Sequence, residues 1–430
     1  MVLLPLLLSR IQGMADWQHR SHLSISAERL HRDLEELAKI GKRPDGSICR
    51  LAFSDEDRAA RALVRRWMKA SGMSVRIDAA GNMCGTHGGK NNALPVLATG
   101  SHLDTVPSGG KYDGALGVVA GLEVVRVLRE NQIRLNRPIE TIVFADEEST
   151  MIGCKAMAGT ASLNPEDYQL KTNLSMAYAV ARLGGNWHKL AQASREDIAA
   201  FVELHVEQGG VLDRANKDIG VVRGLVGQQR YRIKVMGTAN HAGTTPMSMR
   251  QDALTAGARI VLAVEELARS HSGEPVATVG ALQVFPNAAN IIPGLVELTV
   301  DIRDILDETI AEVVGDLKEK LQDIGDRRGV RITMEPILRV HSTPATSEIE
   351  DRIEQVCEAL RLSYMSLPSR ASHDAQELGR IADMGMIFVP SRGGISHSAD
   401  EYTSLEHCVR GANVLLHTLL RLDEYYGTQG

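Results

Sequence analysis

Residues 94–107 read LPVLATGSHLDTVP. The apolar run 94–100 predicts a buried strand, and a polar segment follows where this strand ends. Residues 139–145, 201–204 and 386–389 predict further buried strands of the same kind. Helices are predicted over 54–70, with Ser54 as N-cap, and over 117–129. Apolar strands that alternate with helices predict an α/β sheet covered by helices on both faces.

The stretch 228–340 follows a different pattern. Residues 229–235 and 295–303 alternate between apolar and polar, and 276–284 and 330–340 also predict strands. Helices are predicted over 250–270 and 310–321. The resulting order β-α-β-β-α-β is typical of a ferredoxin-like unit. We therefore expect a smaller domain, 225–340, inserted into a catalytic domain formed by 25–224 and 341–430, after an N-terminal extension, 1–24, that we expect to be disordered.

The composition is that of a globular protein. The 430 residues are 43% hydrophobic and 24% charged, and their formal net charge is −6. The charges form no long run, which argues against a nucleic-acid or membrane partner. The five scattered cysteines contain no C-x-x-C pair and favour a reducing compartment. The apolar start Met1–Leu8 lacks the basic region and cleavage site of a signal peptide, so we expect a cytoplasmic protein.

Ligand-type side chains follow the predicted strands at five places. They are His102 with Asp104, Asp113 at the start of a helix, Asp146-Glu147-Glu148, His205 with Gln208, and His397. In an open α/β sheet, sites form at the carboxyl ends of the strands. Buried carboxylates would repel one another there unless cations neutralised them, and imidazole with carboxylate suits zinc, manganese, cobalt or nickel.

Each of these motifs has an alternative explanation when it is taken alone. A single histidine after a strand is usually a structural or surface residue, and two adjacent acids usually form a solvated turn. Asp113 could simply cap the helix that begins beside it. The joint occurrence of the five motifs at corresponding strand ends favours a metal site.

With these motifs the sequence resembles a known family. It is similar to the dinuclear-metal amidohydrolases of the N-carbamoyl-L-amino-acid hydrolase, β-ureidopropionase and allantoate amidohydrolase group, relatives of the aminoacylase and carboxypeptidase G-like metallopeptidases. The resemblance runs from about Leu30 to the C-terminus and includes ANHAGTTPM at 239–247, NIIPG at 290–294 and DIR at 301–303. It implies a catalytic domain with a mixed sheet flanked by helices, and an inserted lid and dimerisation domain.

The resemblance also implies a set of roles at the metal centre. Two divalent ions would share Asp113 as a bridging ligand. His102 and His205 would complete one site, and Glu148 and His397 the other. Glu147 would be the general base, because a carboxylate already bound to a metal is a poor base. Asp104 would orient the imidazole of His102.

Four further residues are implied to bind the substrate or its oxyanion. Gln208 would contact the ureido group, and Asn290 and Arg303 the substrate carboxylate. His241 would stabilise the oxyanion, often from the other subunit of a homodimer. From the residues alone, Gln208 could instead be a polar turn residue, Arg303 an exposed partner of Asp301 or Glu297, and His241 an ordinary loop histidine.

The implied reaction is hydrolysis of an N-carbamoyl-L-amino acid to the amino acid, ammonia and carbon dioxide. The alternatives are allantoate or another ureido acid, an N-acyl amino acid or dipeptide, and a non-catalytic binding protein on the same fold. The chain departs from the family after the two acids, where Ser149-Thr150-Met151-Ile152-Gly153 replaces the usual Gly and Arg-Phe. This departure affects a wall of the pocket and therefore the choice of substrate.

Overall fold

The computed structural model describes residues 22–172 and 174–428, which form two compact units. The first unit ends at Arg223 and resumes over Ala345–Ser369 and from His373 onward. The second comprises Gly224–Pro344 and Arg370–Ser372, and the predicted inserted domain, 225–340, lies within that range. Of the predicted extension, residues 1–21 lie outside the described residues. Leu23 is buried, and its carbonyl accepts a hydrogen bond from Nε2 of His417 at 3.1 Å.

The first unit is built on a mixed sheet. Its strand order is β1-β2-β4-β3-β5-β15-β6, with β14 also paired to β6 and the short β13 to the end of β6. The pairs β3–β4, β3–β5 and β5–β15 are parallel, so their carboxyl ends meet at one edge. The strands are β1 (Ser74–Ile77), β2 (Met83–His87), β3 (Val96–His102), β4 (Ile139–Phe144), β5 (Ile198–Val206), β6 (Ile219–Leu225), β14 (Tyr364–Ser369) and β15 (Asp383–Val389). The short β13 (Thr343–Pro344) and the last two residues of β6, with which it pairs, belong to the second unit.

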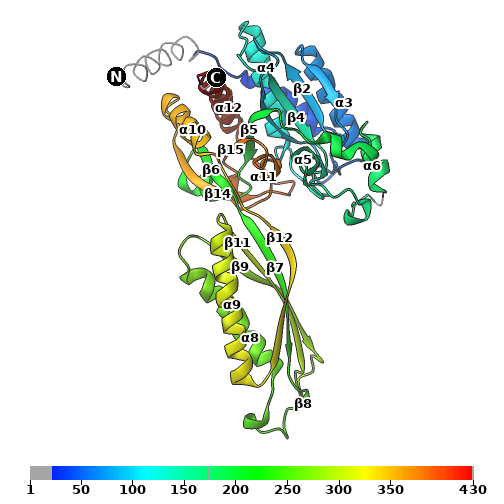
Figure 1. Ribbon diagram of the computed structural model, residues 1–430, viewed down its shortest axis with the longest axis vertical. Helices are drawn as coiled ribbons and strands as arrows, with labels where there is room; N and C mark the ends of the chain where they lie inside the picture. The colour runs from blue at the N-terminus through cyan, green and yellow to red at the C-terminus, as the bar shows by residue number, and fades with distance from the viewer. Residues whose placement is uncertain (1–21, 173, 429–430) are drawn as a thin grey trace. The chain divides into compact units, whose positions relative to one another are not determined.

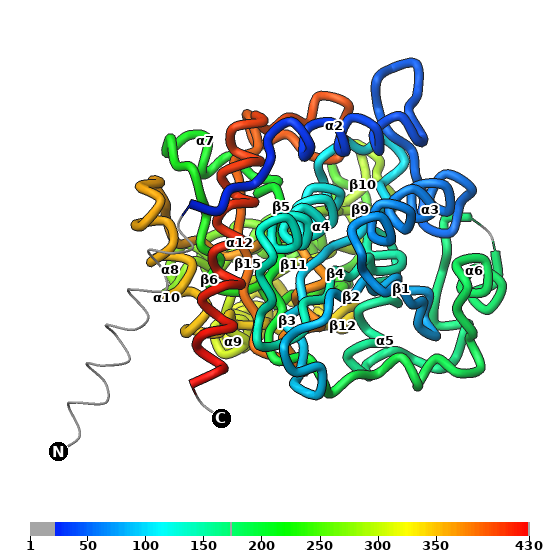
Figure 2. The backbone as a smooth tube through the Cα atoms, turned by 90° about the horizontal axis from the view of Figure 1, so that it is seen from above, coloured from blue at the N-terminus to red at the C-terminus, as the bar shows by residue number. Residues whose placement is uncertain are grey.

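Helices cover both faces of this sheet. One hydrophobic core joins α2, α3, α4 and α12 to the strands, and a second core lies among α5, α6 and the 3-10 helix Trp187–Ala193. Figure 2 shows α4 and α12 beside β3, β5 and β15. The helices are α2 (Ala27–Ala38), α3 (Asp55–Ala70), α4 (Ala115–Glu130), α5 (Ile152–Ala158), α6 (Met176–Arg182), α7 (Val211–Ala215), α10 (Ser347–Ala359), α11 (Asp374–Leu378) and α12 (Leu405–Gly427). Among the described helices, none combines the length and hydropathy needed to cross a bilayer.

Helix α3 begins and ends as its sequence predicts. The Ser54 hydroxyl accepts a hydrogen bond from the backbone N–H of Asp57 at 3.1 Å, which satisfies an N-terminal donor of the helix. Three acids occupy the first turn, Asp55–Asp57, where they complement the helix dipole. The apolar side of α3 packs on β1 and β2. Figure 1 shows α3 beside β2.

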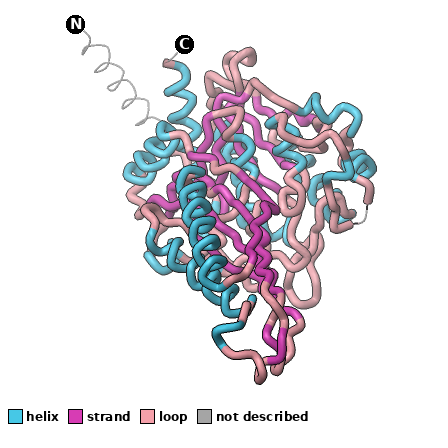
Figure 3. The backbone as a smooth tube through the Cα atoms, turned by 60° about the horizontal axis from the view of Figure 1, so that its bottom comes forward, coloured by secondary structure: helices cyan, strands magenta, loops and turns pink. Residues whose placement is uncertain are grey.

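The second unit has the predicted ferredoxin-like order. Its antiparallel sheet runs β12-β7-β11-β9, and α8 and α9 cover one face (Figure 3). Every second residue of β11 is buried, as its alternating sequence predicts. The elements are β7 (Gly227–Met236), β8 (Asn240–His241), α8 (Ala253–Ser270), β9 (Val276–Phe285), β10 (Ile291–Ile292), β11 (Leu295–Asp304), α9 (Asp307–Arg328) and β12 (Arg331–Val340).

Candidate dinuclear metal centre

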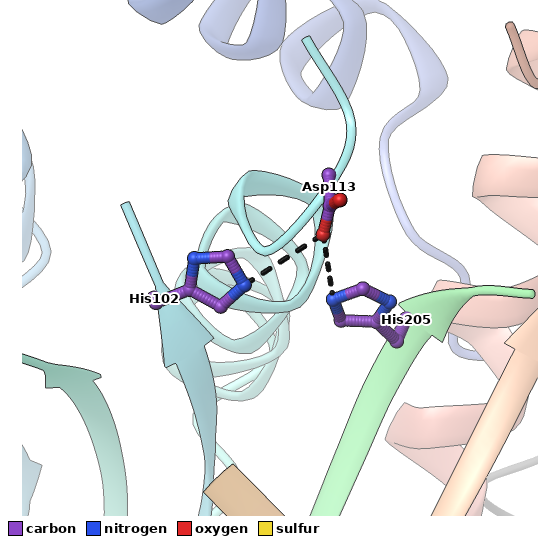
Figure 4. Close-up of side chains that lie close together, drawn as sticks. All are labelled: His102, Asp113 and His205. Carbon is purple, nitrogen blue, oxygen red and sulfur yellow. Dashed lines mark ion pairs between the residues drawn. The ribbon is translucent and has the colours of Figure 1, made fainter. Parts of the chain in front are cut away.

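Asp113 lies between two histidines at the carboxyl edge of the first unit's sheet. Its Oδ1 is 3.1 Å from Nε2 of His205 and 3.7 Å from Nε2 of His102 (Figure 4). Both histidines are buried and stand at the ends of adjacent parallel strands, β5 and β3. Gly114 caps α4 with φ 66°, and a Cβ there would lie 2.5 Å from the His102 ring. Because Gly114 has no side chain, the start of α4 can approach both imidazoles. The N-cap of α4 is Gly114, so Asp113 does not cap this helix with its side chain.

A second group of ligand-type residues uses the other oxygen of the same carboxylate. Oδ2 of Asp113 is 3.2 Å from Nε2 of His397, and the same nitrogen is 3.5 Å from Oε1 of Glu148. The structure thus brings all five predicted metal ligands into two groups that share Asp113. Within each group the potential ligand atoms lie within 4.8 Å of one another.

Backbone carbonyls orient the two buried imidazoles. Nδ1 of His102 is 2.9 Å from the carbonyl oxygen of Asp104, and Nδ1 of His205 is 2.9 Å from that of Val206. A carbonyl only accepts, so each Nδ1 carries a hydrogen, and in the neutral ring the lone pair is on Nε2, the nitrogen that faces Asp113. This arrangement suits metal binding through Nε2. We predicted that Asp104 orients His102; its backbone carbonyl lies closest, whereas its carboxylate accepts a hydrogen bond from the N–H of Glu148 at 3.1 Å.

The acids of the site lack protein cations. Among the described residues, no Lys or Arg forms an ion pair with Asp113, Glu147 or Glu148. Burial raises the pKa of Glu148 to about 7, although His102 opposes the change. Burial, with nearby Asp374 and Glu148, raises the pKa of Glu147 well above its usual value. Isolated buried carboxylates cost several kcal/mol each, so the donor set fits two bound cations.

Glu147 lies beside the two groups without belonging to either. Its Oε2 is 3.6 Å from Nε2 of His102, and its side chain is nearly buried. Non-glycine residues with left-handed backbone flank this region: Asp146 at φ 57°, Gln208 at φ 60° and His397 at φ 54°. Such strained backbone gathers at functional sites, where the surrounding structure holds it in place.

Gln208 contacts the bridging carboxylate. Its Nε2 donates to Oδ2 of Asp113 at 2.9 Å. Its Oε1 is buried and has no hydrogen-bond partner within the described chain. The amide therefore offers one unused acceptor next to both candidate metal positions.

The segment 149–153, where we expect a departure from the family, forms a tight turn beside the acids. The Thr150 hydroxyl donates to Oδ2 of Asp146 at 2.5 Å, and the N–H of Met151 donates to the Asp146 carbonyl at 2.7 Å. This turn supports the left-handed backbone of Asp146, next to Glu147.

The remaining predicted residues lie in the second unit. His241 and Asn290 are neighbours: β8 pairs with β10, and the N–H of Ala242 donates to the carbonyl of Asn290 at 3.0 Å. Nε of Arg303 donates to Oδ1 of Asp301 at 2.9 Å, so the alternative ion pair that we considered for this arginine is present. Arg303 also donates to the carbonyl of Arg370 at 3.1 Å.

The structure adds residues to which we assigned no role. Glu203 precedes His205 by two residues on β5. It accepts hydrogen bonds from the Ser101 hydroxyl at 2.7 Å and from the N–H of Ala375 at 2.9 Å. The ring of His373 lies 4.4 Å from that of His205, and Glu203, His205 and His373 also form a group with metal-ligand spacing. The available sequence signals were an acid inside an apolar strand and the motif Ser372-His373-Asp374.

The chain is similar to known proteins over most of its length. The family model for Peptidase family M20/M25/M40 matches residues 98–421. An N-carbamoyl-L-amino acid amidohydrolase of Geobacillus stearothermophilus is 40% identical, over 93% of this chain and 99% of its own. An allantoate amidohydrolase of Bacillus subtilis is 34% identical, over 90% of this chain and 96% of its own. The crystal structure of a hydantoinase/carbamoylase family amidase from Burkholderia multivorans matches with a TM-score of 0.86 at 35% identity, over 93% and 98%.

Proposed function

The chain belongs to the M20/M25/M40 peptidase family, and from this premise we propose that it hydrolyses N-carbamoyl-L-amino acids. Similar members of the family are named amidohydrolases, so the chain is a hydrolase of amide-type C–N bonds. One observation carries the proposal. Two histidine–carboxylate groups share Asp113, and a separate carboxylate, Glu147, lies beside them.

Two divalent cations would occupy these groups. His102 and His205 would hold one, Glu148 and His397 the other, and Asp113 both. Zinc, manganese, cobalt and nickel all suit such ligands. When bound, these ions would make water more acidic and polarise the carbamoyl oxygen.

Glu147 would move the proton that the reaction requires. As the oxygen of water adds to the carbamoyl carbon, the Glu147 carboxylate takes the proton. The bond between this carbon and the amino-acid nitrogen then breaks, and Glu147 passes the proton to that nitrogen. The released carbamic acid breaks down to ammonia and carbon dioxide. The free Oε1 of Gln208 would accept a hydrogen bond from the ureido NH₂ of the substrate.

His241 is held in the tautomer that an oxyanion donor needs. Its Nδ1 accepts hydrogen bonds from the N–H groups of Gly243 at 3.0 Å and Thr244 at 3.2 Å. Nδ1 therefore carries a lone pair and no hydrogen, so the hydrogen of the neutral ring is on Nε2. The ring is exposed, so this N–H is available to a ligand. We infer that His241 and Asn290 bind the substrate together.

The position of Arg303 favours a homodimer with composite sites. In the register of the second unit's sheet, Arg303 lies beside Gln228, close to where the chain enters this unit at Gly224. His241 follows the opposite end of β7. The ends of this ten-residue strand are about 30 Å apart. One small substrate cannot span that length, so we propose that Arg303 of one subunit and His241 and Asn290 of its partner bind the same substrate molecule.

The second unit has a surface suited to this pairing. β9 is an edge strand that pairs only with β11 in the described sheet. Leu282 and Phe285 on β9 and Leu262 on α8 are large apolar residues, and Leu262 is 66% exposed. Apolar side chains at an unpaired edge favour association with another copy. We propose a two-fold dimer through this surface.

We place this reaction in the cytoplasm, because all five cysteines are free thiols, as suits a reducing compartment. The test is to incubate metal-loaded protein with N-carbamoyl-L-alanine and to quantify ammonia and alanine. Equal amounts of the two products are expected, with activity lost on chelation and restored by divalent metal. Absence of both products would favour the non-catalytic alternative.

A further inference from the structure

One cavity of the first unit lies away from the residues of the metal centre. Its volume is about 420 Å³, within the range of small-molecule sites. The residues that line it belong to α3, the strands β1 and β2, and the end of α6. Ile77, Met83 and Leu183 give it an apolar floor. None of the metal-centre residues lines it.

The walls of this cavity carry an excess of positive charge. The basic residues are Arg58, Arg61, Arg65, Arg66, Lys69 and Arg182, and no acidic residue lines the cavity. Two carboxylates outside the lining pair with three of these basic residues. Asp55 pairs with Arg58 at 3.0 Å and with Arg182 at 2.5 Å, and Asp57 pairs with Arg61 at 2.9 Å.

Three of the basic side chains have no counter-ion. Within the described part of the chain, Arg65, Arg66 and Lys69 form no ion pair and no side-chain hydrogen bond. Nε of Arg182 is likewise buried without an acceptor. Arg65 stands four residues from both Arg61 and Lys69 on α3, a spacing at which like charges repel. The chain as a whole is acidic, with net charge −6, so this concentration of cations is local.

We propose that this cavity binds a small organic phosphate. Guanidinium groups match phosphate oxygens in pairs, and three or more unpaired cations favour a dianion over a single carboxylate. The apolar floor formed by Ile77, Met83 and Leu183 would receive the organic part of the ligand. Both features lie in one cavity, which therefore prefers a phosphate ester to inorganic phosphate.

Phenyl phosphate is a suitable probe, and calorimetric titration of the metal-loaded protein is the measurement. The test variant is Arg65→Gln/Arg66→Gln, because these side chains have no partner to lose. Arg61 is left unchanged, since it also donates to the carbonyls of Val143 and Phe144, which precede the acids of the metal centre. The matched control is Lys318→Gln/Lys320→Gln on α9, which removes the same charge from an exposed helix.

We expect one binding site for phenyl phosphate. Its affinity should fall at least tenfold in Arg65→Gln/Arg66→Gln and should be unchanged in the control. Inorganic phosphate should bind this site at least tenfold more weakly. Turnover and melting temperature of the test variant should stay close to those of the wild type, which shows that the fold is intact. Equal affinities of wild type and test variant, or no saturable binding to the wild type, would overturn the proposal.

Discussion

Glu401 holds the backbone of Asp113: its Oε1 accepts a hydrogen bond from the Asp113 N–H at 3.2 Å. The same oxygen accepts from the N–H of Tyr112 at 2.9 Å, and the Ser396 hydroxyl donates to Oε2 at 3.1 Å. Glu401 is nearly buried and comes from the loop that also carries His397. The Glu401 carboxylate therefore fixes the start of α4, which follows Asp113, relative to the loop that carries His397. These two proposed metal ligands are far apart in the sequence.

This contact predicts a loss of metal affinity without loss of a ligand. Glu401→Ala should weaken metal binding by about 10–100-fold, since groups that position ligands typically have this effect. Glu401→Gln keeps an oxygen for both N–H donors and should lose much less. Titration against a chelator of known affinity measures the difference. Wild-type affinity in Glu401→Ala would show that Asp113 needs no such support.

Replacement of the proposed base should separate catalysis from metal binding. Glu147→Gln keeps the size and polarity of the side chain but cannot accept the proton from water. Loss of a general base typically lowers the rate about 10²–10⁴-fold. Turnover of N-carbamoyl-L-alanine and metal content are measured on the same preparation. If the variant turned over normally, another group, Glu148 or Asp104, would have to be the base.

The sequence predicts the metal centre better than its surroundings, for a physical reason. His102 and His205 each end an apolar run, so their convergence follows from a parallel sheet. The position of Glu203 depends on hydrogen bonds from Ser101 and Ala375. Both residues are distant from Glu203 in the sequence, so the local sequence pattern does not predict these contacts. We also left helix α12 unassigned. Three buried polar residues, His417, Thr418 and Asp423, interrupt the apolar pattern of its inner part.

Acid should destabilise the fold through His417. This histidine is buried in α12, and burial lowers its pKa from 6.5 to about 4. Between these values the unfolded chain binds a proton that the folded chain does not, so stability is full above pH 6.5 and falls as the pH drops toward 4. The contribution is at most about 3 kcal/mol.

Urea unfolding of wild type and His417→Gln at several pH values tests this prediction. Gln keeps a donor for the Leu23 carbonyl but does not titrate. The free energy of unfolding should fall less steeply below pH 6.5 in the variant. If the free energy of unfolding fell equally steeply with pH in both proteins, groups other than His417 would cause the acid sensitivity.

The proposed sharing of His241 between subunits predicts complementation. Glu147→Gln and His241→Ala subunits should each be nearly inactive alone. After reversible dissociation and mixing, heterodimers would contain one site with both native residues, so activity should return to about a quarter of the wild-type value, because half the dimers are mixed and each has one intact site. Wild-type subunits taken through the same treatment provide the control. If they recover and the mixture does not, His241 acts within its own subunit or has no catalytic role.

The most direct test of the proposed function is a comparison of kcat/KM for three substrates. N-carbamoyl-L-alanine, allantoate and N-acetyl-L-alanine are assayed with protein loaded separately with manganese, cobalt, nickel or zinc. The free acceptor of Gln208 predicts a higher kcat/KM for the two ureido substrates than for N-acetyl-L-alanine. The greater similarity to an N-carbamoyl-L-amino acid amidohydrolase than to an allantoate amidohydrolase predicts the highest kcat/KM for N-carbamoyl-L-alanine with at least one of these metals. A higher kcat/KM for allantoate or N-acetyl-L-alanine with every metal would contradict that assignment.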